Sequence, residues 1–244
     1  MRKFGLIGKN IDYSFSQSYF AAKFKAEKIT DATYQNFDLE SISDFPTLLE
    51  DIHIKGLNIT IPYKEVIIPY VDKLDKNARK IGAINTIKFT KKGKLKGYNT
   101  DYYGFKNAIL PHLKAQHTSA LVLGTGGASK AIAYALKKLN ITYTYVSRSA
   151  TKENQISYEQ LTEEIIKTNT IIINCTPLGT FPDIKACPNI PYAAITEEHL
   201  LFDLIYNPEE STFLHYGKQK NATIINGYNM LQLQAEKSWK IWNK

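Results

Sequence analysis

Polar side chains gather at the ends of several short apolar runs in the first hundred residues. In the stretch GLNITIPYKE, Asn58 and Thr60 alternate with the apolar residues of a predicted buried strand, and Lys64 follows after a proline. A lysine near a carboxylate can donate a proton to the alkoxide that forms when a ketone is reduced, or accept it in the reverse reaction. Lys64 and Asp101, from the stretch GYNTD, are therefore a candidate proton-transfer pair.

Both residues also have a plainer interpretation. Lys64 can be a surface lysine in a helix that starts at Pro62, and Asp101 can be the N-cap of the next helix, a role compatible with chemistry. The polar groups around them suit a small ligand with several hydroxyls, because each hydroxyl needs a donor or an acceptor. These further groups are Ser14, Ser16, Asn58, Thr60, Asn85, Thr86, Asn99, Thr100 and Gln234.

Glycines between a predicted strand and a predicted helix, in LVLGTGGASKAIAYAL, indicate a dinucleotide site. Gly124, Gly126 and Gly127, followed by Ala128, allow a tight turn and let backbone N–H groups approach a pyrophosphate at the helix N-terminus. A glycine cluster alone is a weak signal, but the flanking strands and helix supply the required context. Ser129 occupies the third glycine position of the commonest fingerprint.

The end of the next predicted strand, TYTYVS, favours NADP over NAD. An NAD enzyme usually has Asp or Glu there for the ribose 2′-hydroxyl. This chain instead has Ser147, Arg148 and Ser149, with Lys152 nearby and no acidic residue before Glu153. Guanidinium and hydroxyl donors would hold a 2′-phosphate that a carboxylate would repel. The alternative is simply an exposed arginine in a loop.

The apolar runs predict the elements that position these residues. Strands and helices alternate over residues 3–61, a hairpin covers 83–99, and a polar link at 114–119 leads into a second alternating series. Ligands of such sheets collect at the carboxyl ends of the strands. The turn INCTPLGT, with Thr176, is therefore expected to line the nicotinamide ribose.

The composition of the chain limits the other kinds of protein that it can be. The 244 residues, 43% hydrophobic and 22% charged, suit two folded domains, and the apolar runs are too short for a membrane span or a signal peptide, so we expect a cytoplasmic protein. The net charge of +8 comes mostly from lysine, whereas nucleic-acid readers favour arginine, so small anionic ligands fit better. The two cysteines and five histidines show no metal-ligand spacing, and we expect no metal site.

Together and in this order, the motifs resemble the shikimate dehydrogenase family over nearly the whole chain. They are Ser14 and Ser16, NITIPYK, GAINT, GYNTDYYGF, GTGGASKA, INCTPLGT, DLIYNP, and GYNML with Gln234. The resemblance implies an α/β fold of two domains with a cleft between them. An N-terminal substrate domain would comprise residues 1–101 plus 229–244, and a Rossmann-like NADP-binding domain residues 102–228.

The resemblance also implies reversible, NADPH-dependent reduction of 3-dehydroshikimate to shikimate, in the chorismate pathway to aromatic amino acids. Carried over by position, Lys64 and Asp101 match the catalytic pair, Tyr206 matches a tyrosine of the substrate cleft, and Leu204 and Gly227 match positions near the nicotinamide. The groups that match the binding of shikimate's carboxylate and hydroxyls are Ser14, Ser16, Thr60, Asn85, Asp101 and Gln234.

The chain departs from the family pattern in two loops. Gln17, Tyr19 and Phe20 stand where the family usually has proline, histidine and asparagine, which affects the expected carboxylate pocket. In the cofactor loop, Ser147-Arg148-Ser149 replaces Asn-Arg-Thr, and Lys152 replaces an arginine. The retained Arg148 keeps the expectation of NADP.

Two alternatives remain open from the sequence. One is a relative that acts on quinate or another cyclic hydroxy acid, possibly with NAD; the acidic strand tip typical of NAD-using relatives is absent here. The other is a ligand binder without turnover, against which the presence of Lys64 and Asp101 argues. We expect a small-molecule substrate, no nucleic-acid or membrane partner, and a monomer or a homodimer.

Overall fold

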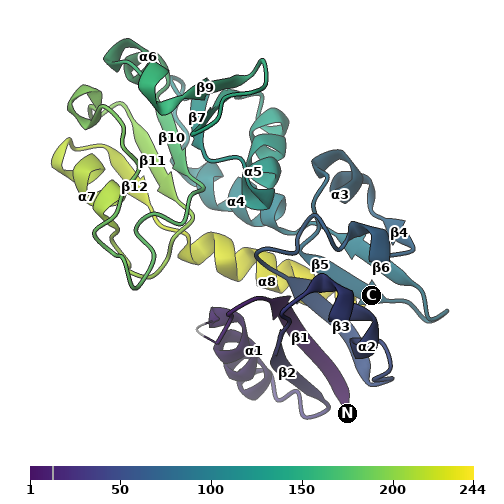
Figure 1. Ribbon diagram of the computed structural model, residues 1–244. Coiled ribbons are helices and arrows are strands. Elements are labelled where there is room, and N and C mark those ends of the chain that lie inside the picture. The colour runs from purple at the N-terminus through teal and green to yellow at the C-terminus, as the bar shows by residue number, and fades with distance from the viewer. Residues whose placement is uncertain (13) are drawn as a thin grey trace. The chain divides into compact units, whose positions relative to one another are not determined.

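The computed structural model of the chain describes residues 1–12 and 14–244 (Figure 1). Within these residues it contains two six-stranded sheets, each in a compact unit of its own. The first unit is Met1–Thr100 with Ala235–Lys244, and the second is Asp101–Gln234. The predicted α/β fold with two domains is confirmed. The predicted domain limits stay a prediction; the boundary between the two units falls inside the C-terminal helix α8 (Tyr228–Trp242).

The first sheet has the strand order β2-β1-β3-β5-β6-β4. Its strands are β1 (Arg2–Gly8), β2 (Ala32–Asp38), β3 (Ile54–Ile59), β4 (Lys73–Leu74), β5 (Thr86–Phe89) and β6 (Leu95–Tyr98). The first three are parallel, and β5 and β6 form the predicted antiparallel hairpin. The sequence did not indicate β4, because two residues at a sheet edge are too short to show a period.

The two faces of the first sheet are covered by different helices. Helix α1 (Phe15–Ala26) and the end of α8 cover one face with a cluster of aromatic rings. The short helices α2 (Phe45–Leu48) and α3 (Lys76–Ile81) contribute to the core on the other face, into which Leu57 and Ile59 point. Because side chains alternate along a strand, Asn58 points to the α8 face. On that face its side chain meets Ser238 of α8.

The second sheet is entirely parallel, with the order β12-β11-β10-β7-β8-β9. Its strands are β7 (Ser119–Leu123), β8 (Thr142–Ser147), β9 (Gln155–Ser157), β10 (Ile171–Asn174), β11 (Leu200–Asp203) and β12 (Thr223–Ile225). Strand order reverses between β7 and β10. The crevice outside the carboxyl ends of two such strands is where open α/β sheets bind ligands.

Helices cover both faces of this second sheet, as Figure 1 shows. Helices α4 (Asp101–Ile109) and α5 (Gly127–Lys138) pack on one face, and α6 (Glu163–Thr168) and α7 (Thr212–Gln219) on the other. Burial on both sides explains why β10 is a continuous apolar run, III, before Asn174. Helices α6 and α7 begin where Thr162 and Ser211 act as their N-caps, each with a side-chain oxygen that accepts from a backbone N–H of the first turn.

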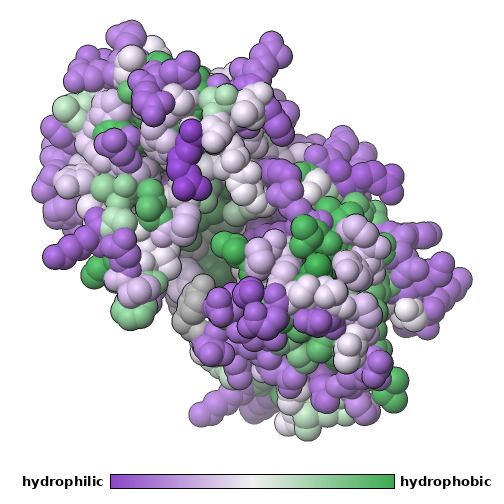
Figure 2. All heavy atoms as spheres, viewed as in Figure 1, coloured by the Kyte–Doolittle hydropathy of each residue, from purple (hydrophilic) through white to green (hydrophobic). Residues whose placement is uncertain are grey.

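Hydrophilic residues cover most of the surface visible in Figure 2, with hydrophobic residues in small patches. In the part of the chain that the structure describes, no helix has both the length and the apolar character needed to cross a membrane.

Trp242 is the residue through which α8 closes the first unit. Its ring stacks on Phe4 at 4.9 Å between centroids, and its indole N–H donates to the carbonyl of Ile87 at 3.0 Å. A Cβ on Gly56 would lie 2.3 Å from the indole, so the strand approaches the ring at a residue without a side chain.

We therefore expect Trp242→Ala to lower the free energy of unfolding by about 3–5 kcal/mol, as for other large aromatic truncations. Trp242→Phe keeps a ring but loses the N–H donor and should lose about 1–2 kcal/mol. Urea unfolding followed by the fluorescence of Trp239 measures both variants. A loss below about 1 kcal/mol in the alanine variant would contradict this role of α8.

Candidate active site

Lys64 lies in a turn that directly follows β3. Residues 61–67 form turns rather than the predicted helix, which was wrong. The carbonyl of Lys64 accepts a hydrogen bond from the backbone N–H of Ile84 at 2.8 Å. This bond joins the turn to the segment that carries Asn85, and it takes the place of a helical bond within the turn. Lys64 itself is half-buried.

A buried hydrogen-bond network connects the segments that carry the predicted substrate groups of the first unit. The amide nitrogen of Asn58 donates to the carbonyl of Asn85 at 3.1 Å and to the hydroxyl of Ser238 at 3.0 Å. Its amide oxygen accepts from the hydroxyl of Tyr34 at 2.9 Å. The hydroxyls of Thr86 and Ser238 lie 2.8 Å apart. These contacts hold Asn58 in place, and its direct contact with substrate stays a prediction.

Asn85 is fixed from a second direction by the residue that precedes Asp101. Its amide nitrogen donates to the hydroxyl of Thr100 at 2.9 Å, and its amide oxygen accepts from the backbone N–H of Thr100 at 2.6 Å. Asp101 then begins α4 and is 5% exposed. A carboxylate in the first turn of a helix is stabilised by the helix dipole.

The serines of the first loop lie at the start of α1. Ser14 is the N-cap, and its hydroxyl accepts from the backbone N–H of Ser16 at 3.2 Å. Ser16 is largely buried and hydrogen-bonds with Tyr34. Burial raises the pKa of Tyr34, and the hydrogen bond from Ser16 opposes that rise. Tyr34 therefore links the serine loop to Asn58.

The departures from the family pattern in this loop have structural roles. The hydroxyl of Tyr19 donates to the carboxylate of Glu236 on α8 at 2.6 Å, and Glu236 also pairs with Lys23. Phe20 is fully buried and stacks on Tyr34 at 4.3 Å between ring centroids. Both side chains thus hold α1 against its neighbours, whereas Gln17 is exposed.

The glycine loop of the second unit has the shape that a dinucleotide pyrophosphate requires. Gly124 has φ +101°, in the left-handed region, and a Cβ there would lie 3.2 Å from a methyl carbon of Thr176. Gly126 precedes α5 with no side-chain cap, and a Cβ there would meet open space. The first N–H groups of α5, from Gly127 on, are therefore available to phosphate oxygens. The residues present fit the phosphate groups of NADP.

The residues predicted to hold the 2′-phosphate follow β8. Ser147 is the last residue of that strand, and its hydroxyl accepts from the backbone N–H of Ser149 at 3.3 Å. Arg148, Ser149 and Lys152 are exposed. Two cations and two hydroxyls thus stand on the carboxyl side of the sheet, one strand from the glycine loop.

The sequence interpretation passed over Asp203, a fully buried carboxyl group at the end of β11. One of its oxygens accepts from the amide nitrogen of Asn174 and from the backbone N–H of Ile205, each at 3.0 Å. The other accepts from the hydroxyl of Ser211. Burial raises the pKa of Asp203 to about 6, so it is mostly ionised at neutral pH.

Three further predicted residues belong to the same region as this carboxyl group. Leu204 and Tyr206 follow it in sequence, and the backbone N–H of Gly227 donates to the carbonyl of Ile205 at 2.9 Å. Leu204 and Tyr206 are half-buried in the loop after β11. Gly227 is buried, and a Cβ there would lie 2.1 Å from the carbonyl oxygen of Leu204, so only glycine fits. Gln234 is 9% exposed, and its amide nitrogen donates to the carbonyl of Leu231 at 3.0 Å.

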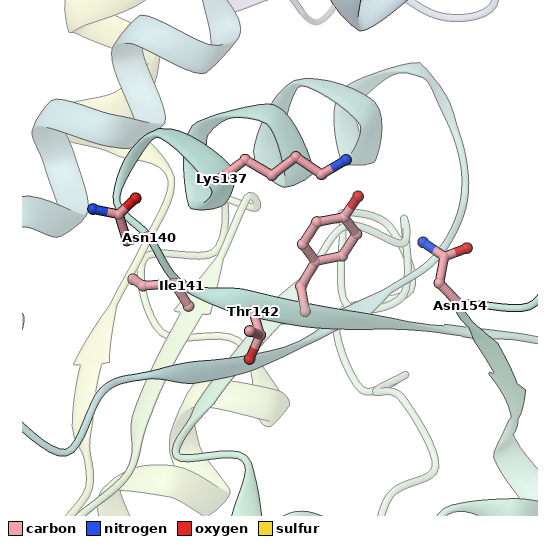
Figure 3. A pocket seen from close by; sticks show the side chains of 6 residues that line it. Lys137, Asn140, Ile141, Thr142 and Asn154 are labelled. Atoms are coloured by element: carbon pink, nitrogen blue, oxygen red, sulfur yellow. The ribbon is translucent and has the colours of Figure 1, made fainter.

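A separate surface depression of about 600 Å³ lies elsewhere on the second unit (Figure 3). It is lined by Lys137, Asn140, Ile141, Thr142, Tyr143 and Asn154. Thr142 begins β8, so the depression lies at the opposite end of that strand from Arg148. None of the predicted site residues lines it.

Three residues that position the site were missed from the sequence: Tyr34, Ser238 and Asp203. Ser238 had a usable signal, because it follows Gln234 by four residues and so shares its helix face. Tyr34 had none, since a tyrosine in a strand is usual core composition. Asp203 ends a predicted strand in the stretch DLIYNP, which made it visible but gave no indication of its partners.

Comparisons with known proteins identify the family and the fold of the chain. A family model described as the shikimate dehydrogenase substrate binding domain matches residues 6–87. The chain is 39% identical to the shikimate dehydrogenase (NADP(+)) of Clostridium beijerinckii, over 100% of this chain and 93% of that protein. Its structure is similar to that of shikimate dehydrogenase from Aquifex aeolicus, with a TM-score of 0.88 and 32% identity over 100% of this chain and 92% of that one.

A quinate dehydrogenase from Corynebacterium glutamicum, solved in complex with NAD, is also similar. The TM-score is 0.87 at 25% identity, over 99% of this chain and 93% of that one. The fold is therefore shared by enzymes named for different substrates, and the side chains must decide between them.

Removing the Tyr34 hydroxyl tests the buried network of the first unit. Tyr34→Phe leaves the amide oxygen of Asn58 without its donor, so we expect the free energy of unfolding to fall by about 1–3 kcal/mol. Tyr70→Phe, at a half-buried tyrosine of the same unit, is the matched control and should change it by less than about 0.5 kcal/mol. Equal effects in urea unfolding would mean that the network does not stabilise the unit.

Proposed function

The chain belongs to the shikimate dehydrogenase family, and we propose that its first unit binds the substrate and supplies Lys64 while its second unit holds NADP. It is an NADP-dependent oxidoreductase that interconverts 3-dehydroshikimate and shikimate in the chorismate pathway. The observation that best supports the role of Lys64 is its backbone bond to Ile84, which fixes the lysine turn beside the network-held Asn85.

Lys64 transfers the proton of the reaction. When the ketone is reduced, negative charge develops on its oxygen, and the Nζ ammonium of Lys64 donates a proton there. In the oxidation of shikimate the neutral amine accepts the proton from the same hydroxyl. A turn held by Ile84 and by the buried ring of Tyr63 fixes the backbone from which the lysine extends, so little backbone entropy is lost when substrate binds.

The other proposed substrate groups have complementary tasks. Ser14 and Ser16, at the N-terminus of α1, offer hydroxyls and the positive end of a helix to the substrate carboxylate. Thr60 and Asn85 offer a hydroxyl and an amide to its hydroxyl groups. The sequence also assigns Asp101, Tyr206 and Gln234 to the substrate, and those roles stay predictions. The predicted cooperation of Lys64 with Asp101 stays a proposal.

The second unit supplies the cofactor site. NADPH held there would supply the hydride that reduces the substrate carbonyl. The glycine loop 124–127 and the first turn of α5, with Ala128, would hold the pyrophosphate, and Ser147, Arg148, Ser149 and Lys152 the 2′-phosphate. Thr176, Leu204 and Gly227 would line the nicotinamide end. The cytoplasmic location and the state as monomer or homodimer stay predictions.

Lys64→Ala should reduce kcat by about 10²–10⁴-fold, the usual contribution of a proton-transfer group, with little change in KM for shikimate. Lys92→Ala, at an exposed lysine of the β5–β6 hairpin, is the control and should retain full activity. A rise in KM at constant kcat would assign Lys64 to binding instead. If Lys64 and Asp101 act on the same step, adding Asp101→Asn to Lys64→Ala should cause little further loss.

Arg148→Ala tests the cofactor assignment. Losing a charge-assisted contact to a phosphate should raise KM for NADP⁺ about 10–100-fold and change that for NAD⁺ less than twofold. Arg79→Ala, in α3, is the matched control. Initial rates at 340 nm should be recorded with shikimate and quinate against both cofactors. An equal loss with NAD⁺ would contradict the role of Arg148, and comparable turnover of quinate would extend the substrate range.

A further inference from the structure

The geometry points to Asp203 as a positioning residue that locks together the two loops proposed to carry the nicotinamide end of NADP. This inference rests on the proposed function, since it takes the second unit as the NADP-binding unit. Asp203 itself lies beneath these loops at the end of β11 and is fully buried. It is therefore not offered as a catalytic residue.

A buried carboxylate is costly unless hydrogen bonds replace the lost water, and Asp203 receives three. They come from three segments: Asn174 at the end of β10, Ile205 in the loop after β11, and Ser211 at the start of α7. Cys175 and Tyr192 are the titratable groups whose pKa values the Asp203 charge raises further, and both are raised mainly by burial. The carboxylate therefore acts as a common acceptor for segments that are distant in sequence.

The first loop is reached through Asn174. Because the amide nitrogen of Asn174 must face the Asp203 carboxylate, its amide oxygen must point the other way. That oxygen accepts from both the backbone N–H and the hydroxyl of Thr176, at 3.0 and 2.7 Å. The orientation of Thr176 is thus set by a carboxylate that it does not touch.

The second loop is reached through the backbone of Ile205. Its N–H donates to the same Asp203 oxygen that Asn174 contacts, and its carbonyl accepts from the N–H of Gly227 at 2.9 Å. Leu204 is held in turn by its N–H bond to the carbonyl of Asn174 at 3.1 Å. The Asp203 oxygen, acting through Asn174 and Ile205, therefore links Thr176 and Gly227, and the Asn174 carbonyl adds Leu204.

None of these bonds reaches the opposite end of the proposed cofactor site. Arg148 and Ser149 follow β8, which pairs with β7 and β9 and not with β10 or β11. Loss of Asp203 should therefore affect the nicotinamide end of NADP and spare the 2′-phosphate end. This separation distinguishes a positioning role from a general loss of stability.

The test compares two ligands on the same variants by isothermal titration calorimetry. The ligands are NADP⁺ and adenosine 2′,5′-bisphosphate, which lacks both the nicotinamide and its ribose. For Asp203→Ala we expect a Kd for NADP⁺ raised tenfold or more, a Kd for adenosine 2′,5′-bisphosphate within twofold of wild type, and a reduced kcat. Asp203→Asn can still accept both bonds at the retained oxygen and donate to Ser211, so it should lie within about threefold of wild type for both ligands.

If Asp203→Ala weakens the binding of both ligands equally, or of neither, the inference is overturned. If Asp203→Ala does not fold, Asn174→Ala removes the bonds to Thr176 together with those to Asp203 and the carbonyl of Leu178, and it should show the same selective loss. Failure of the proposed function is recognised separately, by wild-type protein that binds neither ligand. In that case hydrogen exchange on the ligand-free protein decides: unchanged protection of the Thr176 and Ile205 amides in Asp203→Ala would overturn the positioning role.

Discussion

A polar atom that is buried must find a hydrogen-bond partner, and this requirement organises both units of the protein. In the first unit the side chain of Asn58 satisfies donors and acceptors from β2, from the segment before β5 and from α8. In the second, the carboxylate of Asp203 accepts from donors in β10, in its own loop and at the start of α7. Among the residues that the structure describes, one buried side-chain atom, the amide oxygen of Asn36, has no partner.

The two networks differ in charge, and therefore in how their contribution to stability depends on pH. The network around Asn58 is neutral, so its hydrogen bonds do not depend on pH over the range where carboxyl groups titrate. Asp203 has a folded-state pKa of about 6, above its ordinary value of 3.8. The native state therefore binds a proton between those values that the unfolded chain has lost, and the stability linked to this group falls as pH rises through that window. At neutral pH the ionised form persists because three donors face it.

Most elements could be predicted because local patterns agree with the final fold. The alternation of β3, the helical period of α5 and α8, and the glycine turns were visible in the chain. The strand and the helices that these patterns predict are present. The failures occurred where long-range contacts decide. The turn after β3 is held by Ile84 instead of forming a helix, and β4 and β9 exist only because a neighbouring strand offers unpaired backbone groups.

The sequence alone was enough to recognise the family, to favour NADP and to name the candidate residues from Ser14 to Gln234. The reason is that the chemistry of a site needs particular residue types at strand and helix ends, and their order and spacing are visible in the chain. Sequence could not show which of these groups are held by protein partners, because Asn58 and Ser238 are separated by 180 residues and Asn174 and Asp203 by 29. It also gave no sign that Tyr19 and Phe20, which depart from the family pattern, pack against α8 and Tyr34. Those facts depend on which buried polar and aromatic groups meet, and only the tertiary structure brings them together.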